Sequence, residues 1–252
     1  MVYPADDDLA RDLAVAAGER LLKLRAGGQD AAELRRAGDL GSQDFLAGEL
    51  TRLRPGDAVL SEEAADDHAR LSADRVWIVD PLDGTREFGE EGRVDWAVHV
   101  ALWEGGDLTA GAVALPAQDR VLSTAEPPPP PVLPAPDRPL RLVVSRSRPP
   151  EFVQRLASDI GAELVPLGSA GAKTAAVITG DVDAYVHSGG QYEWDSAAPV
   201  AVARAAGLHT SRIDGSNLSY NAAEPWMPDI LICPVPLADR LLDAISAVQV
   251  RP

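Results

Sequence analysis

The chain has 252 residues, of which 46 % are apolar and 25 % are charged, as expected for a globular protein of one large domain or two modest ones. The single cysteine excludes an internal disulfide, no apolar run reaches the roughly 18 residues of a membrane span, and no basic secretory start is present. We therefore expect a cytoplasmic protein without a membrane partner. The net charge of −16 argues against a nucleic-acid polymer as partner, and it would also repel phosphate anions unless divalent cations reverse the local field.

Two helices are expected at the start of the chain. Over residues 6–27, apolar side chains recur on one helical face, with acidic residues in the first turn and basic residues in the last. A second helix is expected over residues 42–53, where Pro55 and Gly56 end it. Asp39 would then lie just ahead of this helix, as a cap or a loop residue.

Two short strands are expected next, and each is followed by carboxylates. Residues 58–60 form the first strand, with Glu62 just beyond it. Residues 76–79 form the second, which we expect to stop at Asp80 because the proline that follows cannot extend a hydrogen-bond ladder. Asp83 comes three residues later. If the two strands are neighbours in one sheet, these three carboxylates meet at one point and suit a hard cation such as Mg²⁺.

Plainer interpretations exist for the same residues. An Asp-Gly pair such as Asp83-Gly84 is most often only a turn. An EF-hand loop that starts at Asp80 is excluded, because its third and fifth positions would be Leu82 and Gly84, where oxygen ligands are required. An aspartyl-phosphate phosphatase has its two carboxylates two residues apart after a strand, whereas Asp80 and Asp83 are three apart.

An antiparallel meander and a connector complete the first half of the chain. The pattern predicts strands over residues 95–103, 110–115 and 120–124. Eight prolines among the 14 residues 126–139 indicate a stiff spacer, with a PxxP ligand as the alternative. We therefore divide the chain into an N-terminal α+β half, a proline-rich connector and a C-terminal half, which cover residues 1–126, 127–139 and 140–252.

The C-terminal half alternates strands and helices, which is typical of an α/β arrangement. Strands are expected over residues 140–144, 163–166, 183–187, 208–213 and 230–233. Helices are expected over residues 151–161, 169–178, 193–206 and 237–248. Asp195 stands at the start of the third of these helices. It is either a simple helix cap or a fourth carboxylate that reaches the metal site from the second half of the chain.

Four pieces in this order resemble the inositol-monophosphatase superfamily of Mg²⁺-dependent, Li⁺-sensitive phosphatases. They are SEE at residues 61–63, WIVDPLDGT at 77–85, GDVDAY at 180–185 and WDSAA at 194–198. Three further pieces are similar to the branch that acts on 3'-phosphoadenosine 5'-phosphate in sulfate assimilation. They are REF at residues 86–88, VVSRS at 143–147 and LSYN at 218–221.

The resemblance implies a fold and a set of partners. The fold would be a layered αβαβα sandwich of the inositol-monophosphatase, or sugar-phosphatase, type, with two tightly packed halves and the site between them. Members of the superfamily are often homodimers, so a homodimer is possible here. The partner would be a small phosphate ester, a nucleotide bisphosphate.

The resemblance also implies site residues. Two or three Mg²⁺ ions would be held by Glu62, Asp80, Asp83, Asp195 and the carbonyl of Leu82. The candidate substrate contacts are Asp83, Gly84, Thr85, Arg146, Ser169, Lys173 and Asp195. The candidate catalytic residues are Glu62, Thr85 and Asp39. Asp39 stands 23 residues before Glu62, as the superfamily spacing requires, but the usual approach to it is missing, so Asp44 competes for its role.

Three of these candidate residues, Ser169, Lys173 and Arg146, depart from the superfamily pattern or have a plain alternative. Ser169 and Lys173 stand four residues apart, whereas the superfamily has a Ser-x-x-Lys contact to the nucleotide. Arg146 is either a contact to a substrate anion or base, or a surface residue. The backbone amides of Gly84 and Thr85, at a helix start, would hold phosphate oxygens.

The implied reaction is hydrolysis of the 3'-phosphate of 3'-phosphoadenosine 5'-phosphate to AMP and phosphate. A metal-activated water would attack in line, without a phosphoenzyme, and no histidine is given a role because none of the four stands beside a motif. Inositol 1-phosphate or fructose 1,6-bisphosphate are alternative substrates. An alternative of another class is a non-catalytic regulator that binds Mg²⁺ and a nucleotide.

Overall fold

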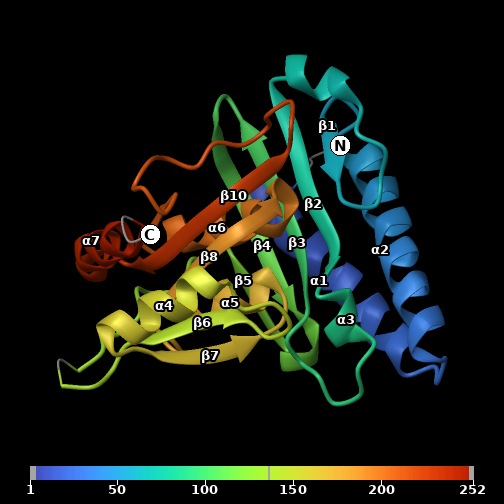
Figure 1. Cartoon of the computed structure of the whole chain (residues 1–252). Helices are drawn as coiled ribbons and strands as arrows, with labels where there is room; N and C mark the ends of the chain where they lie inside the picture. Colours follow the sequence, from blue (N-terminus) through green and yellow to red (C-terminus); the bar gives the residue numbers. More distant parts are fainter. Residues whose placement is uncertain (1–3, 136, 250–252) are drawn as a thin grey trace.

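The computed structural model describes residues 4–135 and 137–249, which form five layers of helices and sheets (Figure 1). Two helices cover the outer face of the first sheet, two helices lie between the first and second sheets, and two more cover the outer face of the second sheet. This is the expected αβαβα order. Each sheet thus buries both of its faces, which explains why its strands are apolar over most of their length.

The N-terminal half contains the first outer helix pair and the first sheet. The helices are α1 (Asp6–Arg25), α2 (Ala31–Leu53) and the short α3 (Thr85–Phe88). The strands, in their spatial order, are β1 (Ala58–Ser61), β2 (Arg75–Asp83), β3 (Ala97–Glu104), β4 (Asp107–Leu115) and β5 (Arg120–Ser123). Strands β1 and β2 are parallel, and the others form the expected antiparallel meander. Two 3₁₀ turns, His68–Ser72 and Pro116–Gln118, lie in the connections.

Helix α2 begins at Ala31, so the prediction that it starts near residue 42 is wrong. Its true start is capped by Asp30, whose carboxylate accepts hydrogen bonds from the backbone of the next turn. Asp39 therefore lies inside the helix and not ahead of it. Gly38, one residue earlier in the helix, serves packing: a Cβ there would lie 2.7 Å from the Phe88 ring.

Strand β2 does not stop at Asp80 but continues to Asp83, which corrects a second prediction. Asp80 pairs with His99 of β3, and Asp83 pairs with Ala97, so β2 has one more residue than β3 between the two pairs. Pro81 lies in this β-bulge, where the missing N–H is not needed for the ladder. The bulge turns both carboxylates of β2 to the same end of the sheet.

The C-terminal half contains the second sheet and the remaining helices. The strands, in their spatial order, are β7 (Glu163–Leu167), β6 (Arg141–Ser145), β8 (Ala184–Tyr192), β10 (Trp226–Pro234) and β9 (Leu208–Ser211). The helices are α4 (Glu151–Ile160), α5 (Ala170–Ile178), α6 (Glu193–Ala205) and α7 (Ala238–Gln249), with a 3₁₀ turn at Val235–Leu237. All the predicted elements of this half are present, although β8 and β10 extend further toward each other than expected.

The two halves meet through the central helices α5 and α6. Helix α6 packs closely on β4, where Gly111 leaves room for Ala201: a Cβ on Gly111 would lie 2.6 Å from the Ala201 methyl. The proline-rich connector forms no helix or strand in its described residues, and Pro130 and Pro131 lie against the turns that follow α6 and α5. The packing of α6 on the first sheet brings the start of α6 to face the end of β2.

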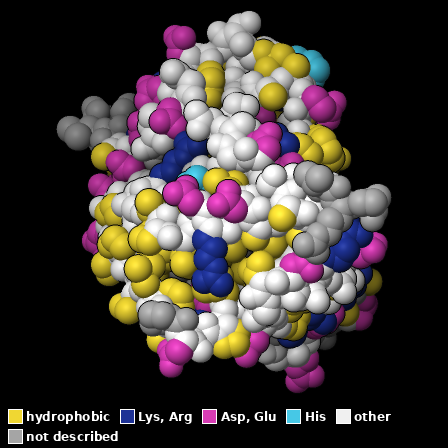
Figure 2. Space-filling model, turned by 60° about the vertical axis from the view of Figure 1, so that its left-hand side comes forward, with side chains coloured by type: hydrophobic (Ala, Val, Ile, Leu, Met, Phe, Trp, Pro, Cys, Tyr) yellow, Lys and Arg dark blue, Asp and Glu magenta, His cyan; other side chains and the backbone are white. Residues whose placement is uncertain are grey.

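Two surface properties complete the description. None of the helices in the described part of the chain is long and apolar enough to cross a bilayer. Acidic side chains are scattered over the face drawn in Figure 2, in keeping with the net charge of −16, and apolar side chains gather in its lower half.

Candidate active site

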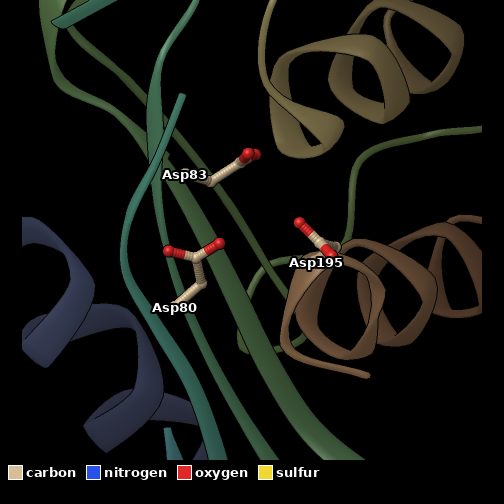
Figure 3. Close-up of side chains that lie close together, drawn as sticks. All are labelled: Asp80, Asp83 and Asp195. Atoms are coloured by element: carbon tan, nitrogen blue, oxygen red, sulfur yellow. The ribbon is translucent and has the colours of Figure 1, made fainter. Parts of the chain in front are cut away.

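Three aspartates from distant parts of the chain meet at the end of β2. Asp80 and Asp83 come from β2, and Asp195 comes from the first turn of α6 (Figure 3). One carboxylate oxygen of each lies within 4.8 Å of those of the other two. Asp80 and Asp83 are 1 % and 7 % exposed. The prediction that the second half of the chain brings a carboxylate to this point thus agrees with the geometry.

Asp83 is held by donors on three sides. Its Oδ2 accepts hydrogen bonds from the Ser169 hydroxyl at 2.5 Å and from the Gly171 N–H at 2.7 Å, and it lies 3.2 Å from His99 Nε2. Burial alone would raise the pKa of Asp83, but His99, Lys173 and Ser169 together outweigh burial and lower it below its usual range. Asp83 is therefore a fixed, permanently ionised carboxylate.

The other carboxylates of the cluster have donors too, but these do not outweigh burial and like charge. Burial and then the Asp195 charge raise the pKa of Glu62 to about 7, and burial and then the Asp83 charge raise that of Asp195 to about 6. Burial, with Glu62 and Asp83 next, raises the pKa of Asp80 well above its usual range. Asp80 is buried, Asp195 is half-buried and Glu62 is exposed, and like charges gathered in this way repel one another. A divalent cation among them would relieve this repulsion. Hard oxygen donors of this kind fit Mg²⁺.

Thr85 joins this cluster to helix α2. Its hydroxyl lies 3.1 Å from Asp39 Oδ1 and 3.1 Å from the Leu82 carbonyl, which the bulge in β2 presents. Burial raises the pKa of Asp39 to about 6. Asp44, the other candidate for the same role, is exposed on α2. The structure therefore brings Asp39, and not Asp44, to Thr85.

A glycine lets the β2 end turn sharply into α3. Gly84 has φ 83°, in the left-handed region that favours glycine, and a Cβ there would lie 3.1 Å from the Ser169 side chain. The backbone at Gly84 and Thr85 consequently approaches the start of α5 closely. These two residues begin α3, as expected.

The cluster opens into a cavity of about 460 Å³ that carboxylates, basic side chains and aromatic rings line together. Glu62, Asp83 and Asp195 line one part. The basic side chains that line the rest are Arg86, Arg148 and Lys173, and the exposed aromatic ones are Tyr192 and Trp226. A ligand that fills the cavity would meet carboxylates, cations and aromatic rings together.

The candidate substrate contacts fall into two groups. Lys173 lines the cavity, is 6 % exposed, and donates from Nζ to the Ser169 carbonyl at 2.7 Å. The Ser169 hydroxyl is already engaged, since it donates to Asp83 and accepts from the Ala172 N–H at 2.9 Å. Ser169 is therefore placed to fix Asp83 and the start of α5, whereas Lys173 is placed to meet a ligand.

Arg146 is not among the residues that line the cavity, although its neighbour Arg148 is. The Arg146 guanidinium pairs with Glu87 at 2.7 Å and with Glu90 at 2.9 Å, which ties α3 to the end of β6. Glu87 itself lines the cavity. A substrate contact by Arg146 therefore stays a prediction, and Arg148 is a second candidate from the same loop.

His99 is a site residue that the sequence analysis missed. It is fully buried, its Nδ1 donates to the Trp194 carbonyl at 3.1 Å, and its Nε2 faces Asp83. It thus joins β3, β2 and the start of α6. Proximity along the chain to a motif was the wrong criterion, because the pairing of β2 with β3 places His99 opposite Asp80.

Comparison with known proteins decides the family. The sequence pattern of the inositol monophosphatase family matches residues 8–233. The chain belongs to the inositol monophosphatase family. Its resemblance to this phosphatase family, and the fold that the resemblance implied, are thus confirmed.

Relatives within the inositol monophosphatase family cover nearly the whole chain. A 3'-phosphoadenosine 5'-phosphate phosphatase of Mycobacterium leprae is 50 % identical over 96 % of this chain and 94 % of that protein. A protein of the same name from Mycobacterium bovis is 51 % identical over 98 % of each chain. The 3'(2'),5'-bisphosphate nucleotidase CysQ of Escherichia coli strain K12 is 30 % identical over 76 % of this chain and 81 % of its own length.

Solved structures of the family have the same fold. The inositol monophosphatase-II of Staphylococcus aureus matches with a TM-score of 0.78 at 22 % identity, and the match covers 96 % of both chains. CysQ from Bacteroides thetaiotaomicron matches with a TM-score of 0.79 at 25 % identity, and the match covers 91 % of this chain and 97 % of that one.

Proposed function

We propose that this chain is a Mg²⁺-dependent phosphatase that removes the 3'-phosphate of 3'-phosphoadenosine 5'-phosphate, giving AMP and phosphate. One observation carries the proposal: a buried cluster of Asp80, Asp83 and Asp195 at a cavity whose other walls hold cations and aromatic rings. The two mycobacterial relatives named for this activity match over almost their full length, which supports the choice of substrate. We place the reaction in the cytoplasm, where the buried free Cys233 would stay reduced.

Glu62, Asp80, Asp83, Asp195 and the Leu82 carbonyl are the proposed ligands of the Mg²⁺ ions. Bound Mg²⁺ supplies positive charge for a phosphate group and lowers the pKa of water. The cluster fits this role because burial and mutual repulsion raise its pKa values and so favour bound protons, whereas a bound cation would offset both causes and keep the carboxylates ionised. Asp83, which His99 and Ser169 fix, gives the ligand set a rigid member.

Asp39 and Thr85 are proposed to orient the attacking water and to take its proton. The Thr85 hydroxyl touches the Asp39 carboxylate, and the pKa of about 6 lets Asp39 accept a proton near neutral pH and release it again. The serine that lines the cavity beside the cluster, Ser169, has its hydroxyl engaged by Asp83 and is not free to attack phosphorus. Direct attack by water is therefore the proposed route.

The two phosphates of the substrate are proposed to occupy different parts of the cavity. The reacting 3'-phosphate would lie at the carboxylate cluster, against the backbone N–H groups of Gly84 and Thr85 at the start of α3. The second phosphate would meet Lys173 and Arg148, because an anion away from the metal ions needs side-chain cations. A substrate with a single phosphate would leave these cations unpaired.

The test is phosphate release by the purified chain from three substrates, with and without Mg²⁺ and Li⁺. We expect the highest kcat/KM with 3'-phosphoadenosine 5'-phosphate, no activity after chelation of Mg²⁺, and inhibition by Li⁺. A higher kcat/KM with inositol 1-phosphate or fructose 1,6-bisphosphate would overturn the substrate proposal. Nucleotide binding without phosphate release at saturating Mg²⁺ would instead favour a non-catalytic regulator.

A further inference from the structure

Two aromatic side chains at the cavity differ from every other aromatic residue that the structure describes. Tyr192 is 44 % exposed and Trp226 is 48 % exposed, whereas the others in the described ranges are buried or half-buried. Both exposed rings line the same cavity as Asp83 and Asp195. Large rings left in water at a cavity that holds charged groups indicate a binding surface for a flat, apolar part of a ligand.

The two rings share one face of the second sheet. Trp226, the first residue of β10, lies directly opposite Tyr192, the last residue of β8, in an antiparallel pair. Residues directly opposite each other point to the same side of a sheet, with their Cβ atoms about 5 Å apart. Together they form one broad aromatic surface, which we call the aromatic platform.

Each ring of the platform is held by its surroundings. The Tyr192 ring stacks on Trp194, with the ring centroids 4.7 Å apart and an angle of 9° between the planes. The Trp226 indole lies beside Gly190, where a Cβ would come within 2.5 Å of the indole Nε1. A ligand that stacks on the platform therefore immobilises little that is not already fixed.

The platform is also tied to the reacting end of the cavity. The Tyr192 N–H donates to Asp195 Oδ2 at 2.6 Å, so the residue that carries one ring is fixed by a carboxylate of the cluster. Lys173 and Arg148 line the same cavity. A ligand with one phosphate at the cluster, a second at the cations and a flat ring system has a partner for each of its parts.

We propose that Tyr192 and Trp226 form the surface on which the adenine base of the substrate stacks, and that this stacking selects nucleotides over polyol and sugar phosphates. The inference rests on the proposed function and assigns its base-recognition residues. Every nucleobase has an aromatic face that stacks on Tyr or Trp, whereas an inositol or sugar ring presents hydroxyl groups and gains much less.

The test compares kcat/KM for 3'-phosphoadenosine 5'-phosphate and for glycerol 2-phosphate, which has no base. Trp226→Ala and Tyr192→Ala should each lower kcat/KM for the nucleotide about 10- to 100-fold, the usual range for loss of one stacking side chain. They should change kcat/KM for glycerol 2-phosphate by less than about two-fold, because the reacting groups are untouched. Trp226→Phe should restore most of the activity on the nucleotide, and Val235→Ala, a change at another exposed apolar residue, should have no effect.

Two kinetic outcomes would overturn the proposal: an equal loss on both substrates, or no loss on the nucleotide. A change of oligomeric mass in Trp226→Ala with unchanged kinetics would also overturn it, because the platform would then be a protein interface. If the wild-type chain does not hydrolyse 3'-phosphoadenosine 5'-phosphate, the proposed function fails, and calorimetric binding of AMP in Mg²⁺ tests the platform by itself. About ten-fold weaker AMP binding by Trp226→Ala would support the platform, and equal binding would refute it.

Discussion

At the carboxylate end of the cavity, Asp80 and Asp83 are almost fully buried, whereas Tyr192 and Trp226 at the aromatic platform expose nearly half of their surfaces. Hydrogen bonds and neighbouring charges hold the carboxylates, whereas packing against Trp194 and Gly190 holds the two rings. Groups that do chemistry must be positioned and dehydrated in advance, but groups that select a substrate need only a complementary surface. Changes at the carboxylate end should therefore stop every reaction, and changes at the platform should alter only substrate choice.

The largest expected effect comes from removing a charge at the carboxylate end. Asp83→Asn should lower kcat/KM on the order of 10³-fold for nucleotide and base-free substrates alike, because the amide is a poor ligand for a hard cation. Phosphate release measures the activity, and circular dichroism during heating measures stability. A folded variant with a loss confined to the nucleotide would break the contrast with the platform, and an unfolded variant would make Asp83 a structural residue.

The pair that is proposed to handle the water should have the next largest effect. Asp39→Asn and Thr85→Val should each lower kcat about 10²-fold on all substrates, as expected when one proton acceptor or its partner is lost. Asp44→Asn, on the same helix but exposed, is the matched control and should behave as the wild type. Equal losses in Asp39→Asn and Asp44→Asn would contradict the assignment of the water-orienting role.

A third prediction concerns Arg70, whose contacts join two segments near the carboxylate end. The buried Arg70 contacts Asp66, Asn221 Oδ1 at 2.6 Å and the Ala222 carbonyl at 2.9 Å, so it ties the loop after Glu62 to the segment that precedes β10. Arg70→Ala should destabilise the fold by about 2–3 kcal/mol, because it removes a buried side chain and its charge-assisted hydrogen bonds.

The Arg70→Ala variant should also need several-fold more Mg²⁺ for half-maximal activity, because Glu193 at the start of α6 accepts hydrogen bonds from the backbone of the same segment. Urea unfolding and a Mg²⁺ titration measure the two effects. Arg155→Ala, at an exposed ion pair of α4, is the control. An unchanged Mg²⁺ requirement in Arg70→Ala would show that the contacts of Arg70 do not affect metal binding.

The smallest predicted effect is a difference in how the stability contributions of Asp195, in the cluster, and Asp183, outside it, depend on pH. In metal-free protein, the folded pKa of Asp195 is about 6, above its unfolded value of 3.8, so its contribution to stability is present below pH 3.8 and is lost as pH rises through about 6. Asp183, which is buried beside Arg138, has a lowered pKa and the opposite sign: its contribution is present above pH 3.8 and is lost as pH falls below its folded pKa.

Urea unfolding in a chelator, at several pH values, measures this difference. Asp195→Asn should stabilise the metal-free protein at neutral pH by about 2 kcal/mol, and the gain should vanish at acid pH. Asp183→Asn should destabilise it at neutral pH. A loss of stability at neutral pH in both variants would show that Asp195 is paired in the metal-free protein, as Asp183 is with Arg138.

Patterns along the chain were sufficient for most of the fold, because periodicity, prolines and helix caps act locally. The starts of the two central helices, at Ser169 and Glu193, could be placed in this way. The motif around Asp195 pointed to the site. Local signals misled at two places: the second helix begins at Ala31 and so contains Asp39, and Pro81 lies in a bulge and not at a strand end.

The parts of the site that escaped prediction depend on contacts between elements. His99 reaches Asp83 only through the register of β2 and β3, which no single segment encodes. The ion pairs of Arg146 with Glu87 and Glu90 likewise depend on how α3 lies against the end of β6. Trp226 carries no motif, and its place opposite Tyr192 follows from the pairing of β8 and β10.

The most direct test of the central claim is the binding of Mn²⁺, as a probe for Mg²⁺, followed by electron paramagnetic resonance of the free ion. The account holds that carboxylates from both halves of the chain bind the same cations. It predicts saturable binding by the wild type and at least about ten-fold weaker binding by Asp195→Asn. The exposed Asp181, changed to Asn in the same half, should leave binding unchanged. Equal Mn²⁺ binding by the wild type and Asp195→Asn would contradict the account.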